Sequence, residues 1–348
     1  MEKENIYGFS LEQLTAKMIG LNQSSYRSKQ LFSWLYKKDA DSFDQMSDVS
    51  KAFREELKEK FSLDLPKIFV KRFSEDGTIK LLLELSDGHK IETVLMHYVY
   101  GDAVCVTSQV GCNMGCKFCA SGLLKKVRNL KVEEMVGQVI VMNRLLKEVD
   151  PSRHVSHIVV MGTGEPFDNY DNVMSFIRIA NSPSGMEIGA RHITVSTCGI
   201  VPGILRYGKE GLQVNLAVSF HAPIDEIRSK IMPVNRAYPL EKLIPALEEY
   251  YADSNRNMTF EYIMIKDLND SDECAKELAK IAKRVHAFVN LIPYNKVVEN
   301  DFERSSNNRI HYFHNYLLSQ GIKSTIRKEF GSDIEAACGQ LRARYEGK

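Results

Sequence analysis

The sequence of 348 residues lacks any apolar run as long as a membrane span, and its first residues, MEKENIYGFS, do not have the pattern of a secretory signal. We therefore expect a cytoplasmic protein without a membrane-spanning segment. The sequence also lacks an excess of charge, because 46 Lys and Arg residues stand against 45 Asp and Glu residues, for a formal net charge of +1. Nucleic-acid binding would thus depend on local basic patches rather than on overall charge.

Cysteine residues are few, and they do not pair as disulfides or zinc sites require. The chain has seven, an odd number, and no secretory signal, so we expect no disulfide framework. A structural zinc site needs four ligands, commonly as two short-spaced pairs, and no second Cys-x2-Cys pair is present. His154 and His157 have a plausible spacing, but they stand alone. A zinc site is therefore not favoured.

Three of the cysteines lie within eight residues, in the segment GCNMGCKFCASG. Cys112, Cys116 and Cys119 form a Cys-x3-Cys-x2-Cys motif, and three thiolates at this spacing can hold three irons of a [4Fe–4S] cluster. The fourth iron then has no protein ligand and can bind a small molecule, which in the radical S-adenosylmethionine (SAM) enzymes is SAM itself. The alternative is a structural or electron-carrying iron–sulfur protein, which would need a fourth cluster ligand.

The pattern of apolar residues divides the chain into three parts. Residues 1–65 have helical spacing and a capping-box sequence at Ser10, which predicts a small helical accessory domain. Residues 66–100 contain two Asp-Gly pairs between β-rich runs, which predicts a β-hairpin linker. Strands and helices alternate in residues 101–348, where we expect the catalytic domain.

The third part predicts an α/β fold with a partial (β/α)6 barrel, similar to a TIM barrel with fewer units. Six apolar runs separated by amphipathic stretches indicate parallel strands with right-handed crossovers. In such folds the chemistry takes place at the carboxyl ends of the strands. The predicted strands are 104–107, 157–161, 193–196, 214–219, 259–265 and 288–292.

Small and polar residues follow several of these strands directly. Gly164 and Glu165 follow the second strand, where a glycine lets the backbone approach a ligand and a carboxylate can bind an ammonium group. Each such residue alone is more typical of a turn or of a satisfied polar group. Together they predict a SAM site held from several strands. The other candidates are Ser196, Ser219, Phe220, His221 and Asn295.

As a set, these motifs resemble the RlmN/Cfr family of radical SAM ribosomal RNA methyltransferases, and within it the RlmN type. The resemblance covers nearly the whole chain and implies methylation at C2 of an adenosine in 23S rRNA and at adenosine-37 of some tRNAs. Cys198 departs from the family, which usually has Ser there, so we expect Ser196 to contact SAM and Cys198 to take no part. The matching segments are GCNMGCKFCASG, VVMGTGEPFDNYDNV, ARHITVSTCGIVP, VSFHAPIDEIRSKIMPVN, VNLIPYN and DIEAACGQL.

The resemblance also implies roles for two further cysteines and a carboxylate. Cys338 would carry the methyl group as S-methylcysteine, and Cys105 would release the product by forming a transient disulfide with Cys338. Glu92 would be the proton acceptor, although a strand carboxylate on its own is more typical of the surface. Because adenine C2 is electron-poor, the implied route uses two SAM molecules per turnover. One methylates Cys338, and the other is cleaved at the single [4Fe–4S] cluster to a 5′-deoxyadenosyl radical.

The implied partners are RNA and a reducing protein such as a flavodoxin or ferredoxin, and we expect a monomer. Within the family, the alternative is the Cfr type, which methylates C8 of the same adenosine and confers antibiotic resistance. Pro166 after Glu165 favours the RlmN type, since Cfr-type chains tend to carry Ala there. Candidate contacts to RNA phosphates are Lys125, Lys126, Arg128, Arg191, Arg228, Lys230, Arg304, Asn307, Asn308, Arg327 and Lys328.

Overall fold

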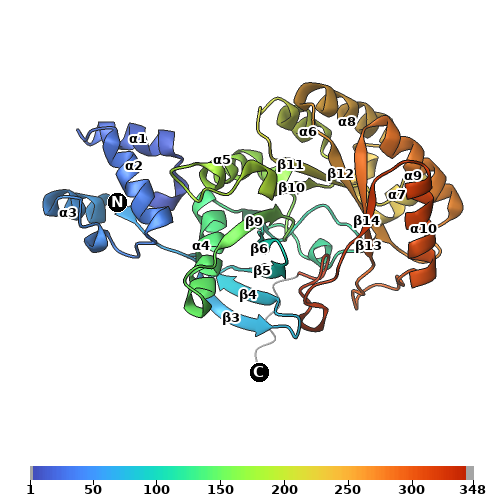
Figure 1. Ribbon diagram of the computed structural model, residues 1–348, viewed down its shortest axis with the longest axis horizontal. Helices are drawn as coiled ribbons and strands as arrows, with labels where there is room; N and C mark the ends of the chain where they lie inside the picture. Colours follow the sequence, from blue (N-terminus) through green and yellow to red (C-terminus); the bar gives the residue numbers. More distant parts are fainter. Residues whose placement is uncertain (1–2, 342–348) are drawn as a thin grey trace.

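The computed structural model describes residues 3–341, which form a small helical unit beside a larger open barrel (Figure 1). The helical unit lies at the left of Figure 1, and the short strands β1 and β2 pair in parallel where the chain enters and leaves it. Its elements are β1 (Glu4–Asn5), α1 (Leu11–Gly20), α2 (Tyr26–Phe32), α3 (Lys51–Lys60) and β2 (Phe61–Ser62).

The capping box expected at Ser10 is present in the helical unit. The Ser10 side chain accepts the backbone N–H of Gln13 at 3.2 Å, and the Gln13 side chain accepts the N–H of Ser10 at 2.8 Å, which completes the capping box of α1. The unit is fastened to α4 (Val132–Val149) of the barrel, where Arg144 donates to Asp39 at 3.0 Å.

The six predicted parallel strands are confirmed, and each pairs in parallel with the next along the chain. A seventh parallel strand, β14 (Ser324–Ile326), was not predicted from the sequence; it pairs with β13. Three residues are too few to carry a recognisable alternation. The six strands are β6 (Gly101–Cys105), β9 (Val155–Val160), β10 (Ile193–Thr197), β11 (Asn215–Ser219), β12 (Met258–Met264) and β13 (Ala287–Pro293).

The strands of the expected linker continue the sheet of the barrel. β3 (Lys67–Phe73), β4 (Ile79–Glu84) and β5 (Lys90–Tyr98) form two hairpins, and β5 then pairs antiparallel with β6. Gly77 and Gly88 occupy the turns with φ of +86° and +82°, which glycine adopts without strain. The result is one sheet of ten strands, with β14 at one edge and β3 at the other.

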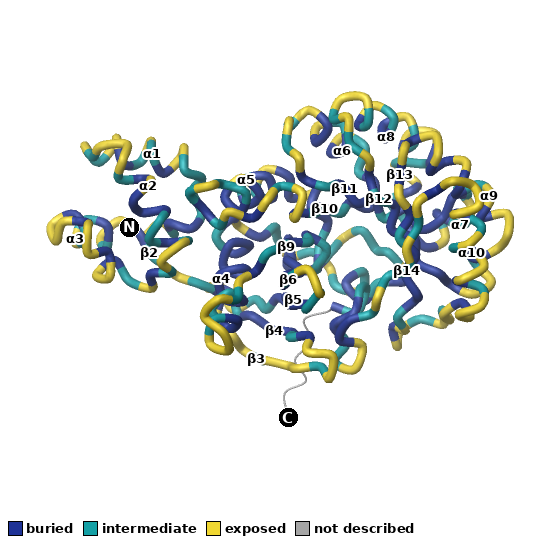
Figure 2. The backbone as a smooth tube through the Cα atoms, viewed as in Figure 1, coloured by how far each residue is buried: buried dark blue, intermediate teal, exposed yellow. Residues whose placement is uncertain are grey.

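Helices cover the outside of the barrel, while the strands are largely buried (Figures 1 and 2). In α9, Cys274, Leu278 and Ile281 are buried at helical spacing against the sheet. None of the helices in residues 3–341 combines the length and the apolarity needed to cross a membrane. The remaining helices are α5 (Tyr170–Asn181), α6 (Val201–Gly208), α7 (Asp225–Ile231), α8 (Leu240–Ser254), α9 (Asp272–Arg284) and α10 (Asn307–Ser319).

The segment after β14, residues 327–341, runs from one edge of the sheet to the other, and we call it the C-terminal strap. The N–H of Gly331 donates to the Asp76 carboxylate in the β3–β4 turn at 3.0 Å. Lys80 of β4 donates to the backbone carbonyl of Glu335 at 2.9 Å. The ring of Phe330 lies 4.6 Å from that of Tyr98 at the end of β5. The strap therefore bridges the open side of the partial barrel.

Candidate functional site

Two adjoining cavities contain most of the predicted site residues. The larger, of about 150 Å³, is here called the cluster cavity, and the smaller, of about 60 Å³, the thiol cavity. Phe220 lines neither, because its ring stacks in the core on that of Phe260, with centroids 4.3 Å apart. The cluster cavity is lined by Cys112, Cys116, Gly164, Glu165, Ser196, Ser219 and His221, the thiol cavity by Cys105 and Asn295, and both by Cys119 and Cys338.

The loop that carries the three cysteines is closed at its base by β7 (Gln109–Val110) and β8 (Arg128–Asn129), which pair antiparallel. Gly111 begins the loop at φ +75°, and a Cβ there would lie 2.1 Å from the carbonyl oxygen of Lys125. The close approach of these two segments therefore requires glycine at this position.

The chemistry of the three thiols fits an iron–sulfur cluster better than a single ion. Among the described residues, no three Cys, His, Asp or Glu side chains converge as ligands of one metal ion. The thiols of Cys112, Cys116 and Cys119 instead line one cavity, as expected when each binds a different iron. Burial raises the pKa of Cys112 to about 11 and that of Cys116 well above its usual value, so ligation by a cation would be needed to keep them as thiolates.

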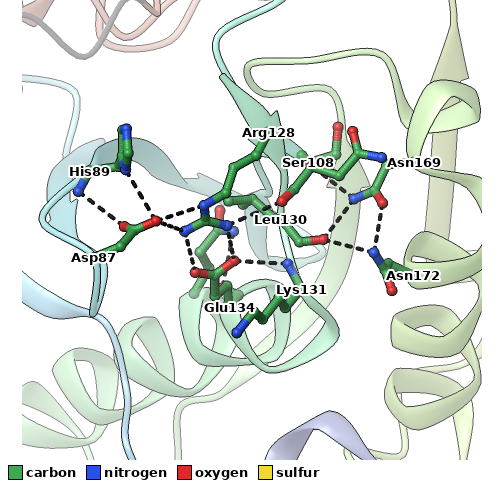
Figure 3. Close-up of polar contacts among 11 residues, drawn as sticks. Asp87, His89, Ser108, Arg128, Leu130, Lys131, Glu134, Asn169 and Asn172 are labelled. Carbon is green, nitrogen blue, oxygen red and sulfur yellow. Dashed lines mark hydrogen bonds and ion pairs between the residues drawn. The ribbon is translucent and has the colours of Figure 1, made fainter. Parts of the chain in front are cut away.

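Arg128 of β8 forms hydrogen bonds to α4 and to the turn between β4 and β5 (Figure 3). Its guanidinium donates two hydrogen bonds of 2.8 Å to Glu134 at the start of α4, and its Nε donates to Asp87 in the β4–β5 turn at 2.7 Å. Asn169 donates to a backbone carbonyl on each side of the cysteine loop, both at 2.9 Å. These contacts fix the two ends of the segment that carries the loop.

The carboxylate of Glu165 is buried in the wall of the cluster cavity. Its two oxygens accept the N–H groups of Phe167 at 3.0 Å and of Cys198 at 2.7 Å. Burial raises the pKa of this carboxyl, although the N–H of Cys198 favours its charged form. Gly164 lies at φ +114°, and a Cβ there would come within 2.7 Å of Gln109. The side chain is therefore held in one orientation, as a ligand for an ammonium group would need to be.

His221 is held neutral at the end of β11. Burial lowers the pKa of the imidazole to about 3, and its Nδ1 accepts the N–H of Ile263 at 3.1 Å. The edge-on ring of Phe118, from the cysteine loop, lies 4.6 Å away. His221 thus joins the cysteine loop to the strand ends as an uncharged part of the cavity wall.

Cys338 lies on the C-terminal strap, where it lines both cavities. Asn295, after β13, donates to the backbone carbonyl of Cys338 at 3.2 Å, and the N–H of Ala120 donates to that of Gly339 at 2.7 Å. Cys105 ends β6, and burial raises the pKa of its thiol to about 12. Cys338 and Cys105 are both free thiols. Cys338 therefore shares one cavity with the three cluster cysteines and another with Cys105.

Glu92 is buried, against the expectation for an isolated strand carboxylate. It lies on β5 at 5% exposure and forms an ion pair of 3.2 Å with Lys80, whose side chain is equally buried. Alternation along the strand puts Glu92 on the same face as Val94 and Met96, which line the thiol cavity. The side chain thus shares the face of β5 that carries this cavity, although Glu92 itself lines neither cavity.

Several residues expected to contact RNA phosphates are engaged within the protein. The prediction for Arg228 is wrong, because its side chain is fully buried in α7. Arg128 pairs with Asp87 and Glu134. Arg304 pairs with Glu329 at 2.8 Å. Lys126 pairs with Asp168 at 2.6 Å. Arg304 is nevertheless exposed, and the other exposed candidates are Lys125, Arg191, Lys230, Asn307, Asn308 and Lys328.

Two residues of the site differ from their predicted roles. Arg327 lines both cavities and pairs with the buried Glu261 at 3.6 Å, although it was expected on an RNA-binding surface. Its neighbour Lys328 is basic too and lines the thiol cavity, and no local pattern of the sequence distinguishes such residues from surface cations. Cys198 was expected to take no part, yet it lines the cluster cavity and orients Glu165.

Comparison with known proteins identifies the family. Residues 4–63 match the ribosomal RNA large subunit methyltransferase N-terminal domain, and residues 106–279 match the radical SAM superfamily. The probable dual-specificity RNA methyltransferase RlmN of Spiroplasma citri is 52% identical over 99% of this chain and 98% of its own length. The protein of the same description from Enterococcus faecalis is 50% identical over 100% of this chain and 98% of its own length.

The chain belongs to the RlmN family of radical SAM RNA methyltransferases. A crystal structure of a radical SAM methyltransferase from Sphaerobacter thermophilus is 43% identical, with a TM-score of 0.92 over 98% of this chain and all of that one. The predicted family and fold class are therefore confirmed. Membership of the radical SAM superfamily implies a [4Fe–4S] cluster and SAM, which the donor set of the cluster cavity fits.

Proposed function

We propose that this protein methylates C2 of an adenosine in 23S rRNA, and adenosine-37 of some tRNAs, with Cys338 as the carrier of the methyl group. The observation that supports this most directly is the position of Cys338, which lines both the cluster cavity and the thiol cavity. From one side its sulfur can meet SAM held near Cys112, Cys116 and Cys119. From the other it can meet Cys105.

Within the proposal, each residue performs a separate step. The Cys338 sulfur loses its proton and takes a methyl group from one SAM. A bound cluster and a second SAM supply radical chemistry that removes a hydrogen atom from this methyl group, so that its carbon bonds to C2. The Cys105 thiolate then attacks the Cys338 sulfur, the sulfur–carbon bond breaks, and the carbon keeps the electron pair and takes a proton. Before that attack, Glu92 accepts the proton lost from C2, and the electron that began the reaction returns to the bound cluster.

The SAM site in this proposal is formed by the ends of β9, β10 and β11. Glu165 binds the ammonium group of SAM, since both of its oxygens are already oriented. Ser196, Ser219 and His221 complete the wall. Asn295 holds the strap that carries Cys338.

The RNA in this proposal meets two parts of the protein. Residues 1–65 act as the RNA-docking accessory domain, residues 66–100 as the link, and residues 101–348 as the catalytic barrel. An adenine within a fold must be unstacked before C2 is reachable. The enzyme works as a cytoplasmic monomer, and a flavodoxin or ferredoxin supplies the electron and reduces the disulfide.

Analysis of the RNA product tests the proposal. Protein prepared without oxygen and loaded with iron and sulfide is mixed with SAM, a reductant and unmodified 23S rRNA, and nucleosides are then separated by chromatography with mass detection. The expected product is 2-methyladenosine, and the Cys112→Ala variant should give none. A main product of 8-methyladenosine would show a Cfr-type enzyme instead, and the absence of any methylated adenosine would refute the assignment.

A further inference from the structure

Arg228 is a fully buried cation behind the wall of the cluster cavity. Its side chain has 0% exposure, in α7, and it does not line either cavity. Nη2 donates to the carbonyl oxygens of Cys198 at 2.8 Å and Ser219 at 3.4 Å, and Nε donates to that of Phe220 at 3.1 Å. One guanidinium thus ties together the carboxyl ends of β10 and β11, whose side chains line the cavity.

The partners of Arg228 are all uncharged. Besides the three carbonyls, Nη1 donates to the side-chain oxygen of Asn235 at 2.8 Å. The carboxylate of Asp225 attracts the guanidinium through space, but its hydrogen bonds come from Asn235 and from the N–H of Leu240 rather than from Arg228. Within residues 3–341, no carboxylate forms an ion pair with Arg228. A buried charge without a direct ion pair is costly, so a further anion nearby would stabilise it.

The helix that carries Arg228, α7, packs against the cysteine loop. The N–H of Lys117 donates to the carbonyl of Ile231, the last residue of α7, at 2.9 Å. Cys116 and Cys198 belong to the same small apolar group as Ile231. A negative charge on Cys116 would interact favourably with the Arg228 guanidinium. When three thiolates hold a cluster, this region gains the negative charge that the buried guanidinium lacks.

We propose that Arg228 is the buried counter-charge of the iron–sulfur cluster and raises its reduction potential, while its hydrogen bonds position the strand ends of the SAM site. The inference rests on the proposed function, because it requires a cluster on Cys112, Cys116 and Cys119. Reduction adds a negative charge to the cluster, and a fixed cation that does not reorganise favours the reduced form. Arg228 acts through charge and position, since it touches neither SAM nor the RNA.

The test is the midpoint reduction potential of the anaerobically loaded protein, followed by electron paramagnetic resonance during redox titration. Arg228→Gln removes the charge and keeps hydrogen-bond donors. Its reduction equilibrium should become at least tenfold less favourable, which is a negative shift of about 59 mV for one electron. Arg228→Lys keeps the charge and should shift less than half as far. Lys230→Gln removes an exposed charge two residues away and should leave the potential unchanged.

A second variant covers the case in which Arg228→Gln does not fold. Asp225→Asn leaves the guanidinium in place and removes the carboxylate that attracts it, while its amide oxygen can still accept from Asn235 and from the N–H of Leu240. The potential should then move in the positive direction. An unchanged potential in either variant, or equal shifts in Arg228→Gln and Arg228→Lys, would overturn the inference. If the parent protein takes up about four irons and cleaves SAM, these failures concern Arg228 alone. A parent that takes up no iron would instead refute the proposed function.

Discussion

At the scale of single residues, the polar groups near the two cavities are buried and fixed by specific partners. Glu165 accepts two backbone N–H groups, His221 accepts one, and Glu92 pairs with Lys80. Burying such groups costs free energy unless each has a hydrogen-bond partner. Removing one partner costs more free energy, because the buried group that remains cannot bond to water instead. The site should therefore respond strongly to the loss of a single partner, even where that partner takes no part in chemistry.

The Lys80–Glu92 ion pair offers the clearest stability test. Lys80→Met should lower the free energy of unfolding by about 3 kcal/mol, since it removes the cation from a buried carboxylate. Lys80→Met combined with Glu92→Gln should recover most of that loss, because no charge is then left buried. Urea unfolding of the three proteins measures both values. A double variant as unstable as Lys80→Met alone would show that the pair does not behave as a coupled buried charge pair.

The neutral imidazole of His221 predicts a pH dependence of stability. Its pKa is about 3 in the folded protein, against an ordinary value of 6.5, so between these values the unfolded chain binds one more proton. The free energy of unfolding should therefore fall as the pH drops from 6.5, by about 1.4 kcal/mol per pH unit from this residue alone. Asn can accept the same N–H and tolerates the φ of +58° at this position.

The prediction is tested by the slope of the unfolding free energy against pH, measured by urea titration between pH 6.5 and 5 for the unsubstituted protein and two variants. His221→Asn should flatten it by the amount given, whereas the exposed His154→Asn should not change it. Equal slopes in all three proteins would mean that His221 is protonated in the folded state.

At the scale of elements, the sequence predicts what depends on local pattern. Apolar runs identified the six main strands, the Asp-Gly pairs identified both hairpins, and the capping box marked the start of α1. β14 was missed because three residues carry no period. The burial of Arg228 was missed because helical spacing does not reveal that α7 is packed against the cysteine loop.

The C-terminal strap is the element on which the proposed chemistry most depends. Asp76 holds it by accepting the N–H of Gly331. Burial raises the pKa of this carboxyl, but hydrogen bonds from Thr78, Gly331 and Ser74 outweigh burial and bring it down to about 2. Asp76→Ala should therefore speed amide hydrogen exchange in residues 331–337, while Glu75→Ala should not. In the parent, this protection should be complete above pH 3.8 and lost as the pH falls through 2.

Hydrogen exchange followed by mass spectrometry, at one pH for all three proteins, measures the effect. Unchanged exchange in Asp76→Ala would show that the strap is held by other contacts, such as that of Lys80 with Glu335.

At the scale of the whole molecule, the two edges of one sheet meet through the strap. β3 to β5 extend the barrel at one edge, β14 ends it at the other, and the strap that crosses between them carries Cys338. The sequence could place Cys338 and Cys105 in one site only through family resemblance, since 233 residues separate them and no local pattern links them. Burial of Glu92 was likewise invisible, because its partner Lys80 lies across a strand pair.

The central claim is that Cys338 carries the methyl group to RNA and that Cys105 acts only afterwards. The most direct test is the Cys105→Ala variant, loaded with iron and sulfide and incubated without oxygen with SAM, reductant and 23S rRNA. It should methylate Cys338 and bond to RNA, then stop, because no second thiol can displace the Cys338 sulfur. Mass spectrometry after nuclease digestion should find a modified adenosine attached to Cys338, and Cys338→Ala should show neither this adduct nor S-methylcysteine. Normal turnover by Cys105→Ala with no adduct on Cys338 would contradict the account.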